Sequence, residues 1–508
     1  MEWLQAFIGI FEPQVLFFLT LGVVAGALIG VLPGLTATMA IAVLTPMTFW
    51  LPPASGFAML IGVYNSVIWA GGIPSILINT PGTPANIATT LDGYPLSQKG
   101  HAMMALNINT VFSVVGGLSS SLVLIFFAFP MAGFALRFGP AEMAVVAFFG
   151  LSMMIGVSGK SPLKGLLTGF IGLLLATIGL DSMYAFRRFT MGTPMLLDGI
   201  SFVPVMIGLF GIGEVLYQIY TSDHGHMEKI NEVTRSKKKF LSLKELKQAF
   251  PLNLLTLGIS NFIGIIPGAG GDIASIISWG QCKRLSKRSH EYGKGSLEGL
   301  AISCSSNSAV IGGSMTTMLA LGIPGDAVTA VLIGALMMYG MTPGPQMFID
   351  NRDFVLTLAA LLVFANVMIL IFGLITSRIY PKILRVKKQT LWVAVIVCCF
   401  VGGFAINNSP VDLIAMSIAG LLGFVLRKMD FPLGPMVLGL LLGRMLEANL
   451  RRALTISAGS YSIFLASPIA VFLIVCTALS LIAPPIVQYI KDRRKKQTIG
   501  TSSTTEES

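Results

Sequence analysis

One apolar stretch of the chain, residues 312–334, carries helix-breaking residues and an acid at its centre, where it reads Gly322-Ile-Pro-Gly-Asp326. Proline removes a backbone donor and glycine loosens the chain, so the stretch predicts a helix that breaks near Gly322 and restarts after Pro324. A bilayer tolerates broken backbone only where it lines a cavity or is buried in protein. The rest of the chain is therefore expected to fold around this break.

The same plan occurs a second time, in residues 71–93. Gly71-Gly72 corresponds to Gly312-Gly313, and Pro81-Gly82 corresponds to Pro324-Gly325. Further pairs follow in the same order along the chain: Pro33 with Pro267, Ser161-Pro162 with Ser409-Pro410, and Pro204 with Pro435. The preserved order predicts that the sequence contains an internal repeat.

Composition places the chain in a lipid bilayer. Of its 508 residues, 54% are hydrophobic and 11% are charged, whereas soluble domains carry roughly 25% charged residues. A spanning helix needs about 20 apolar residues, and on that basis we expect about eleven or twelve membrane segments, several of them short. The predicted fold class is an all-α polytopic membrane protein whose two repeats contain broken or re-entrant helices.

The distribution of basic residues predicts how the repeats are oriented. The loop after the Pro33 break is neutral (residues 49–55), whereas the loop after its counterpart at Pro267 is basic (residues 283–294). The next pair of loops shows the opposite bias. The loop after the Pro81 break carries Lys99, whereas the loop after the Pro324 break has no charge over residues 339–348. Under the positive-inside rule, equivalent loops then lie on opposite sides of the membrane. This is an inverted-topology repeat, which is the architecture of many secondary transporters.

The predicted organisation has four parts. A first membrane repeat covers residues 14–220, a basic cytoplasmic linker residues 221–250, a second membrane repeat residues 251–487, and a disordered cytoplasmic tail residues 488–508. The net charge of +11 is concentrated between apolar segments. It therefore indicates membrane topology, and no nucleic acid partner is predicted.

Nothing in the sequence favours catalysis. The five cysteines show no metal or disulfide spacing, and the candidate Ser and Cys nucleophiles have no histidine partner at membrane depth. No enzyme activity and no cofactor are expected, apart from a coupling Na⁺ or H⁺. A secondary transporter explains the repeat and the opposed breaks, while an ion channel or a structural membrane scaffold stays open as the alternative, because the hydropathy fits it equally.

Several longer motifs resemble one transporter family. They are Gly30-Val-Leu-Pro-Gly34, Asn79-Thr-Pro-Gly-Thr-Pro84, Leu91-Asp-Gly-Tyr-Pro95, Arg188-Phe-Thr-Met-Gly192, Asp198-Gly-Ile-Ser-Phe-Val-Pro204, Gly264-Ile-Ile-Pro-Gly-Ala-Gly-Gly271, Leu321-Gly-Ile-Pro-Gly325 and Leu446-Glu-Ala-Asn-Leu-Arg-Arg452. With these segments the chain resembles the large membrane subunit of the tripartite tricarboxylate transporters, the TctA family.

The resemblance implies a multi-pass permease in the bacterial inner membrane. It implies that the permease acts together with a small membrane subunit and a periplasmic substrate-binding protein. It also implies that the system imports organic carboxylates, tricarboxylate or related, by cation coupling. In one place the chain departs from the family pattern. Where a Pro-Glu pair and then Asn-Asn are expected before the Gly-Gly, it has Ser303-Cys304 and Asn307-Ser308, so the expected acid is absent.

The breaks themselves predict a substrate site. Helices that start after Pro-Gly present free backbone donors and positive dipole ends, which suit a carboxylate. The predicted substrate-binding residues are Gly34, Asn79, Thr80, Pro81, Gly82, Thr83 and Asn86 in the first half, and Gly268, Asn307, Ser308, Thr316, Thr317, Pro324 and Gly325 in the second. The alternative for each Ser, Thr and Asn is a hydrogen bond between neighbouring helices.

Two acids lie in apolar surroundings, Asp272 and Asp326. Such residues usually mark functional sites in membranes, and we predict that they couple a cation, either by coordinating Na⁺ or by carrying a proton. The alternative is helix capping, since aspartate favours helix N-termini.

Two groups of charged residues remain, and the first of them, Arg187 and Arg188, lies on the side predicted to be external. Arg187 and Arg188 are candidates for binding-protein docking or a substrate funnel, with a solvated face as the alternative. Glu447, with Arg444, Arg451 and Arg452 at helical spacing, predicts a local ion-pair cluster.

Overall fold

The computed structural model describes residues 2–157, 162–181, 184–222, 242–268, 270–376 and 388–479. The chain divides into two compact units. Unit 1 comprises Met1–Arg137 and Ile200–Asp430, and unit 2 comprises Phe138–Gly199 and Phe431–Ser508. Each unit thus takes residues from both predicted repeats. The repeat boundaries and their membrane orientation stay predictions; most of the predicted linker and the whole predicted tail lie outside the described residues.

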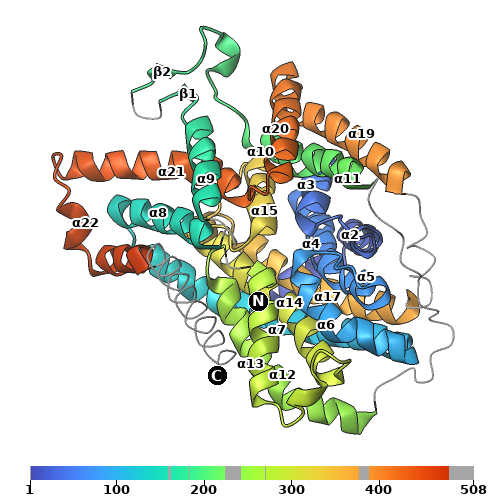
Figure 1. Ribbon diagram of the computed structural model, residues 1–508. Helices are drawn as coiled ribbons and strands as arrows, with labels where there is room; N and C mark the ends of the chain where they lie inside the picture. The colour runs from blue at the N-terminus through green and yellow to red at the C-terminus, as the bar shows by residue number, and fades with distance from the viewer. Residues whose placement is uncertain are drawn as a thin grey trace, which may run out of the picture. The chain divides into compact units, whose positions relative to one another are not determined.

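In its described residues, unit 1 is helical (Figure 1). Its first part contains α1 (Glu2–Gly9), α2 (Pro13–Val31), α3 (Ala37–Thr48), α4 (Pro53–Ala70), α5 (Gly72–Ile78), η1 (Pro84–Asn86), α6 (Ile87–Leu96), η2 (Ser97–His101) and α7 (Ala102–Ala135). Its second part contains α10 (Phe202–Met206), η4 (Ile207–Ile212), α11 (Gly213–Ser222), α12 (Leu243–Ile265), α13 (Gly270–Leu285), η6 (Ser289–Glu291), α14 (Leu297–Leu321), α15 (Ala327–Met338), α16 (Met347–Asp350), α17 (Arg352–Thr376), α19 (Lys388–Asn407) and α20 (Pro410–Lys428).

Unit 2 is built from α8 (Pro140–Val157), α9 (Pro162–Ala176), η3 (Pro194–Leu196), α21 (Gly434–Ile456) and α22 (Ile463–Ala466). Between α9 and η3 a short antiparallel hairpin pairs β1 (Gly179–Leu180) with β2 (Arg187–Arg188), in a register that sets Gly179 opposite Arg188.

The structure confirms the predicted all-α membrane class. In the described part of the chain, 6 helical segments are long and apolar enough to cross a membrane, and shorter apolar helices of 10–17 residues accompany them. Several of these segments are well buried within the protein. The segment Pro53–Ile78, which leads into the first break, is 94% buried over its most apolar window.

Both predicted helix breaks are present. In the second half, α14 ends at Leu321, and Gly322 caps it in the left-handed conformation (φ 70°). The chain becomes helical again at Ala327, directly after Asp326. In the first half, α5 ends at Ile78, and Asn79 takes the same left-handed role (φ 53°). Glycine and asparagine are the residues that adopt this conformation most readily, which explains why each helix stops there.

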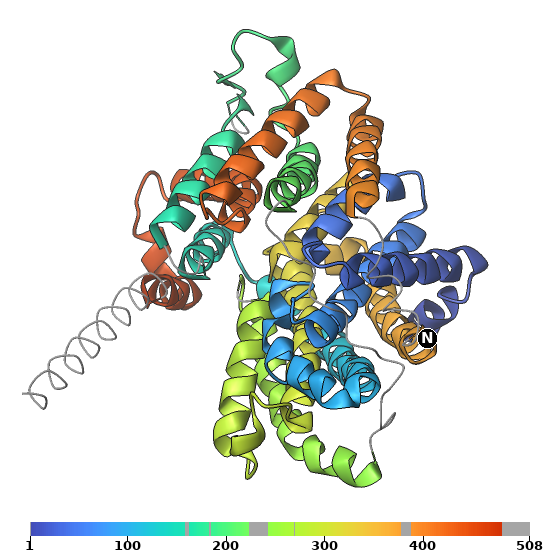
Figure 2. The same ribbon diagram turned by 45° about the vertical axis from the view of Figure 1, so that its right-hand side comes forward.

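Close helix contacts support both breaks. Helices α12, α13 and α14 run side by side in both ribbon views (Figures 1 and 2). Helix α2 packs along α4 through Gly22, Gly26 and Gly30. A Cβ atom at these glycines would lie 2.2, 2.8 and 2.7 Å from carbonyl oxygens of α4. No side chain fits there, so the α2 and α4 backbones touch directly.

The predicted inversion is testable with tags. Tags at residues 230–240 and 285–292 are expected to report the cytoplasm, because both segments are rich in Lys and Arg. A tag at residues 343–347 is expected on the opposite side. Accessibility to a membrane-impermeant reagent in intact cells and in inverted vesicles measures this. If residues 285–292 and 343–347 share one side, the inverted repeat is wrong.

Candidate functional site

The break in the first half is held in place by Asn86. Its Nδ2 donates to Thr83 Oγ1 (2.7 Å) and to the Ile68 carbonyl (3.1 Å). Gly82 lies so close to Gly71 that a Cβ there would lie 2.5 Å from the Gly71 Cα. The Gly82 N–H also donates to the Gly71 carbonyl (3.1 Å). The broken segment is therefore fixed against the preceding helix by amide groups and by the absence of side chains.

The break in the second half is held by Asp326. Its Oδ1 accepts from the Thr329 N–H (2.7 Å), and the Thr329 hydroxyl accepts from the Asp326 N–H (2.9 Å). This reciprocal pair is a capping box at the start of α15. The carbonyl of Gly325 accepts from the Gly268 N–H (2.8 Å), so the segment that follows α12 contacts this break directly. The capping alternative for Asp326 is thus present in the structure.

Two buried side chains connect the halves to each other. The hydroxyl of Tyr64, on α4, donates to Asp326 Oδ2 (2.6 Å). The amide of Asn307, on α14, donates through Nδ2 to Asn86 Oδ1 (2.9 Å). Tyr64 is completely buried, and Asn307 is 2% exposed. Each half therefore reaches into the break of the other.

These contacts follow one numerical relation. Pro81 and Pro324 lie 243 positions apart, and the same separation relates Thr83 to Asp326, Asn86 to Thr329 and Tyr64 to Asn307. The bond between Thr83 and Asn86 therefore corresponds to the capping box of Asp326 and Thr329. The two crossing side chains, Tyr64 and Asn307, are counterparts as well. Contacts that repeat in this way support the internal repeat.

The N-terminus of α13 lies against both breaks. A Cβ on Gly270 would lie 3.5 Å from Asp326 Cβ, and one on Gly271 would lie 3.2 Å from Ala85 Cβ, in η1. Asp272 follows in the first turn, with an exposed side chain. Among the described residues no group donates to its carboxylate, so the capping alternative for Asp272 has no support in the observed contacts. Helix α13 thus brings a second acid to the place where the Tyr64–Asp326 and Asn307–Asn86 bonds join the two halves, which we call the crossing point.

The crossing point therefore combines two kinds of groups. The amides of Asn86 and Asn307 and the N-terminal N–H groups of α13 suit an anion. The carboxylates of Asp272 and Asp326 suit a cation, and the buried Oδ1 of Asn307 has no hydrogen-bond partner in the described part of the chain. An unsatisfied buried oxygen is costly, and it is the kind of ligand that Na⁺ accepts. The arrangement favours binding of an anion together with a cation.

Other predicted residues lie away from this point or bond to backbone. Asn79 and Thr80 are exposed, and the Thr80 hydroxyl donates to the Ile78 carbonyl (3.1 Å). The hydroxyl of Thr316 donates to the Gly312 carbonyl (2.7 Å) and that of Thr317 to the Ile265 carbonyl (2.8 Å). These two threonines thus make the helix contacts given as the alternative to substrate binding.

Gly34 also differs from its counterpart. A Cβ there would lie 2.2 Å from Nε2 of Gln218, on α11, and this amide donates to the Gly34 carbonyl (2.9 Å). Its counterpart Gly268 instead contacts Gly325 at the second break. Of the remaining predicted residues, Pro81 precedes Gly82 and Pro324 precedes Gly325 in the two breaks, while Ser308 follows Asn307; Ser308 and Pro324 are buried.

Sequence reasoning missed Tyr64 and Thr329 as members of the site. Tyr64 lies in an apolar segment, and a buried tyrosine usually needs a partner for its hydroxyl. The separation that relates Pro81 to Pro324 identifies both residues as counterparts of Asn307 and Asn86. That separation was the available signal.

Comparison with known proteins is consistent with the motifs. Residues 16–438 match the family model described as the tripartite tricarboxylate transporter TctA family. An uncharacterized 52.8 kDa protein in the TAR-I ttuC' 3' region of Agrobacterium vitis is 34% identical over 475 residues, covering 94% of each chain.

An uncharacterized protein in the TAR-II ttuC' 3' region of the same organism is 34% identical over 226 residues, which is 44% of this chain and 93% of that one. No solved structure matches. The family match extends over both helix breaks and over every residue of the crossing point. The protein belongs to the tripartite tricarboxylate transporter TctA family.

Proposed function

We propose that the chain is the permease that carries an organic carboxylate into a bacterial cell across the inner membrane, driven by Na⁺ or H⁺. The observation that carries this proposal is the pairing of Asp272 and Asp326 with the Asn86–Asn307 bond at one crossing point. The substrate carboxylate would bind the amides and the helix N-terminus. The cation would bind or protonate the two acids.

Electrostatics supports coupling of the two ligands. An unneutralised carboxylate pair repels a substrate anion, so the site is expected to bind substrate well only after a cation has joined the acids. Each ligand then raises the affinity for the other, because coupling between sites is reciprocal. Moving an anion inward against the membrane potential costs about 2.3 kcal/mol per charge per 100 mV, and co-imported cations offset this cost.

Concentrative uptake tests the proposal. In proteoliposomes with an inward Na⁺ or H⁺ gradient, labelled organic carboxylate is expected to accumulate above its external concentration. Carboxylate flux that only equilibrates the two sides, or ion current without carboxylate, would favour a channel instead. The absence of any flux with the complete set of components would favour a structural role.

The partners are part of the same proposal. We expect uptake to require a small membrane subunit and an extracytoplasmic substrate-binding protein, as the family's three-part organisation implies. Omitting either one from proteoliposomes is expected to reduce initial uptake to the level of empty liposomes. Full uptake by this chain alone would contradict the dependence on partners while leaving carboxylate transport intact.

A further inference from the structure

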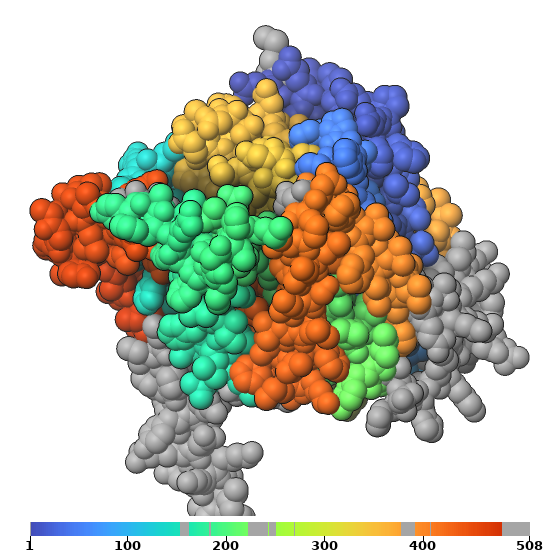
Figure 3. Space-filling model, turned by 90° about the horizontal axis from the view of Figure 1, so that it is seen from above, coloured from blue at the N-terminus to red at the C-terminus, as the bar shows by residue number. Residues whose placement is uncertain are grey.

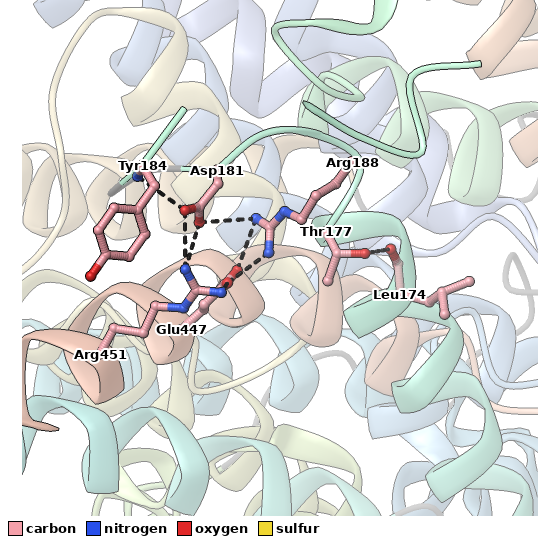
Figure 4. A network of polar contacts seen from close by, with 7 residues as sticks. All are labelled: Leu174, Thr177, Asp181, Tyr184, Arg188, Glu447 and Arg451. Atoms are coloured by element: carbon pink, nitrogen blue, oxygen red, sulfur yellow. Dashed lines mark hydrogen bonds and ion pairs between the residues drawn. The ribbon is translucent and has the colours of Figure 1, made fainter. Parts of the chain in front are cut away.

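The hairpin of unit 2 is fixed by four charged side chains (Figure 4). Arg188 donates to both oxygens of Glu447, from Nη1 to Oε1 (2.6 Å) and from Nη2 to Oε2 (3.1 Å). Arg451 donates from Nη1 to both oxygens of Asp181 (2.9 and 3.0 Å) and pairs with Glu447 through Nη2 (2.8 Å). The side chain of Asp181 is 3% exposed. The predicted cluster around Glu447 is thus confirmed for Arg451, and it also fastens the hairpin to α21.

The same segment exposes large apolar side chains. Tyr184, Phe186, Phe189, Met191 and Met195 are 60–82% exposed. They belong to residues 184–195, which include the end of the hairpin and the segment after β2; the green part of the chain that contains this segment is visible in Figure 3. A groove of about 310 Å³ beside them is lined by Tyr184, Arg451, Leu454 and Thr455. Exposed apolar side chains gathered next to a groove are typical of an interaction surface.

The backbone under these side chains is held in an unfavourable conformation. Ala185, Phe189 and Met191 have φ angles of 56°, 52° and 48°. For residues other than glycine this left-handed region costs roughly 1–2 kcal/mol each. The bidentate Arg188–Glu447 pair and the buried Asp181 carboxylate hold the hairpin despite that cost. The apolar side chains are therefore presented in a fixed geometry, which lowers the entropy lost when a partner binds.

The charge of this surface indicates what it binds. The four charges of the network cancel, because Asp181 and Glu447 neutralise Arg188 and Arg451. Among the described residues, Arg187 of this segment is exposed, as are Arg444, which donates to the Asp198 carbonyl (3.4 Å), Arg452 further along α21, and the acid Asp198. Aromatic residues, methionine and arginine are the residue types enriched at protein interfaces. The surface fits a partner with an apolar centre and an acidic rim.

We propose that residues 184–195, with the exposed arginines around them, form the docking surface for the extracytoplasmic substrate-binding protein. This inference rests on the proposed function. A protein partner fits better than a lipid headgroup layer, because a fluid layer gains nothing from a backbone held in a strained and fixed shape. The docking partner is thus a folded protein that presents carboxylates around an apolar patch.

The test uses the full chain in nanodiscs and, as probe, the purified binding protein that supports uptake by the wild type. The variant Phe186→Ala/Arg187→Glu/Met191→Ala is expected to bind this probe at least tenfold more weakly. Phe170→Ala is the matched control, because Phe170 is 58% exposed on α9 of the same unit but lies outside the hairpin. Its affinity is expected to equal that of the wild type. Unchanged affinity of the triple variant would overturn the docking assignment.

A photoreactive residue at Met191 separates the two classes of contact. Cross-linking to the purified binding protein is expected, and cross-linking to lipid alone, with the probe present in excess, would overturn the proposal in favour of a membrane contact. Failure of the wild type to bind any extracytoplasmic binding protein, combined with uptake by this chain alone, would instead contradict the partner dependence in the proposed function.

Discussion

Replacing Asp326 with asparagine is expected to abolish or strongly slow cation-driven uptake while leaving the helix cap in place. Asparagine caps about as well as aspartate, and its side-chain oxygen can still accept from the Thr329 N–H. What the variant loses is the negative charge beside α13 and the acceptor Oδ2 of the Tyr64 hydroxyl, which can instead accept from the new amide. If one co-transported cation is lost, about 2.3 kcal/mol of driving force per 100 mV is lost with it. At 100 mV the steady-state accumulation ratio would then fall about fiftyfold.

Thr329→Ala is the matched control for this prediction. It removes the hydroxyl that accepts from the Asp326 N–H and so weakens the capping box without changing any charge. We expect a loss of stability of up to about 1 kcal/mol and an unchanged dependence of initial uptake on Na⁺ or H⁺. The cation dependence of both variants decides the role of Asp326. Equal cation dependence in Asp326→Asn and the wild type would reduce Asp326 to a structural cap.

Replacing Asn307 with alanine is expected to raise the KM for the carboxylate by about five- to hundredfold with little change in kcat. The variant removes the donor to Asn86 Oδ1 and leaves that buried oxygen unpaired, which lowers stability by about 1–3 kcal/mol. It also removes one amide proposed to bind the substrate carboxylate, and a hydrogen bond to a charged group contributes about 1.5–3 kcal/mol, which accounts for the rise in KM. Loss of an interaction made equally in the ground and transition states raises KM and leaves kcat unchanged. Initial rates over a range of carboxylate concentrations measure the effect.

Thr316→Val is the control on the same helix. Thr316 is also fully buried, but its hydroxyl donates to the Gly312 carbonyl of its own helix. Valine keeps the shape and removes only this bond, so KM is expected to stay within about twofold of the wild type. A KM for Thr316→Val that rises as much as that for Asn307→Ala would mean that burial along α14, not the crossing point, sets the affinity.

The helix breaks were predictable because their causes are local. Proline and glycine restrict or loosen the backbone wherever they stand, so Gly322 and Pro324 mark the end of a helix whatever surrounds them. Membrane class was equally accessible, since hydropathy depends on composition alone. The order of the repeated motifs then indicated which positions correspond.

The partners of individual side chains were less accessible. Thr83, Thr316 and Thr317 are all threonines of the two predicted broken stretches, yet among them only the hydroxyl of Thr83 bonds to a residue of the crossing point. Which way a hydroxyl turns depends on whether a neighbouring carbonyl lies within reach, and that is decided by tertiary packing. The hairpin of unit 2 shows the same limit. For Arg188 the sequence suggests docking, a substrate funnel or a solvated face but no ion pair, because nothing local indicates that Glu447, 259 positions away, lies opposite it.

The direct backbone contact between α2 and α4 restricts how this protein can alternate its access. Helices that meet without intervening side chains cannot slide past each other, because any shift drives carbonyl oxygens into Cα atoms at Gly22, Gly26 and Gly30. The pair must travel as one rigid body and carry the Gly82 tip with it. Gly264, where a Cβ would lie 2.5 Å from the Val310 carbonyl oxygen, couples α12 to α14 in the same way. Gly116 and Gly312, where a Cβ would lie 2.1 and 1.8 Å from carbonyl oxygens of Ser305 and Ser120, lock α7 to α14 as well. Rearrangement during a transport cycle is thus left to contacts between the α2–α4 pair and the group formed by α7, α12 and α14.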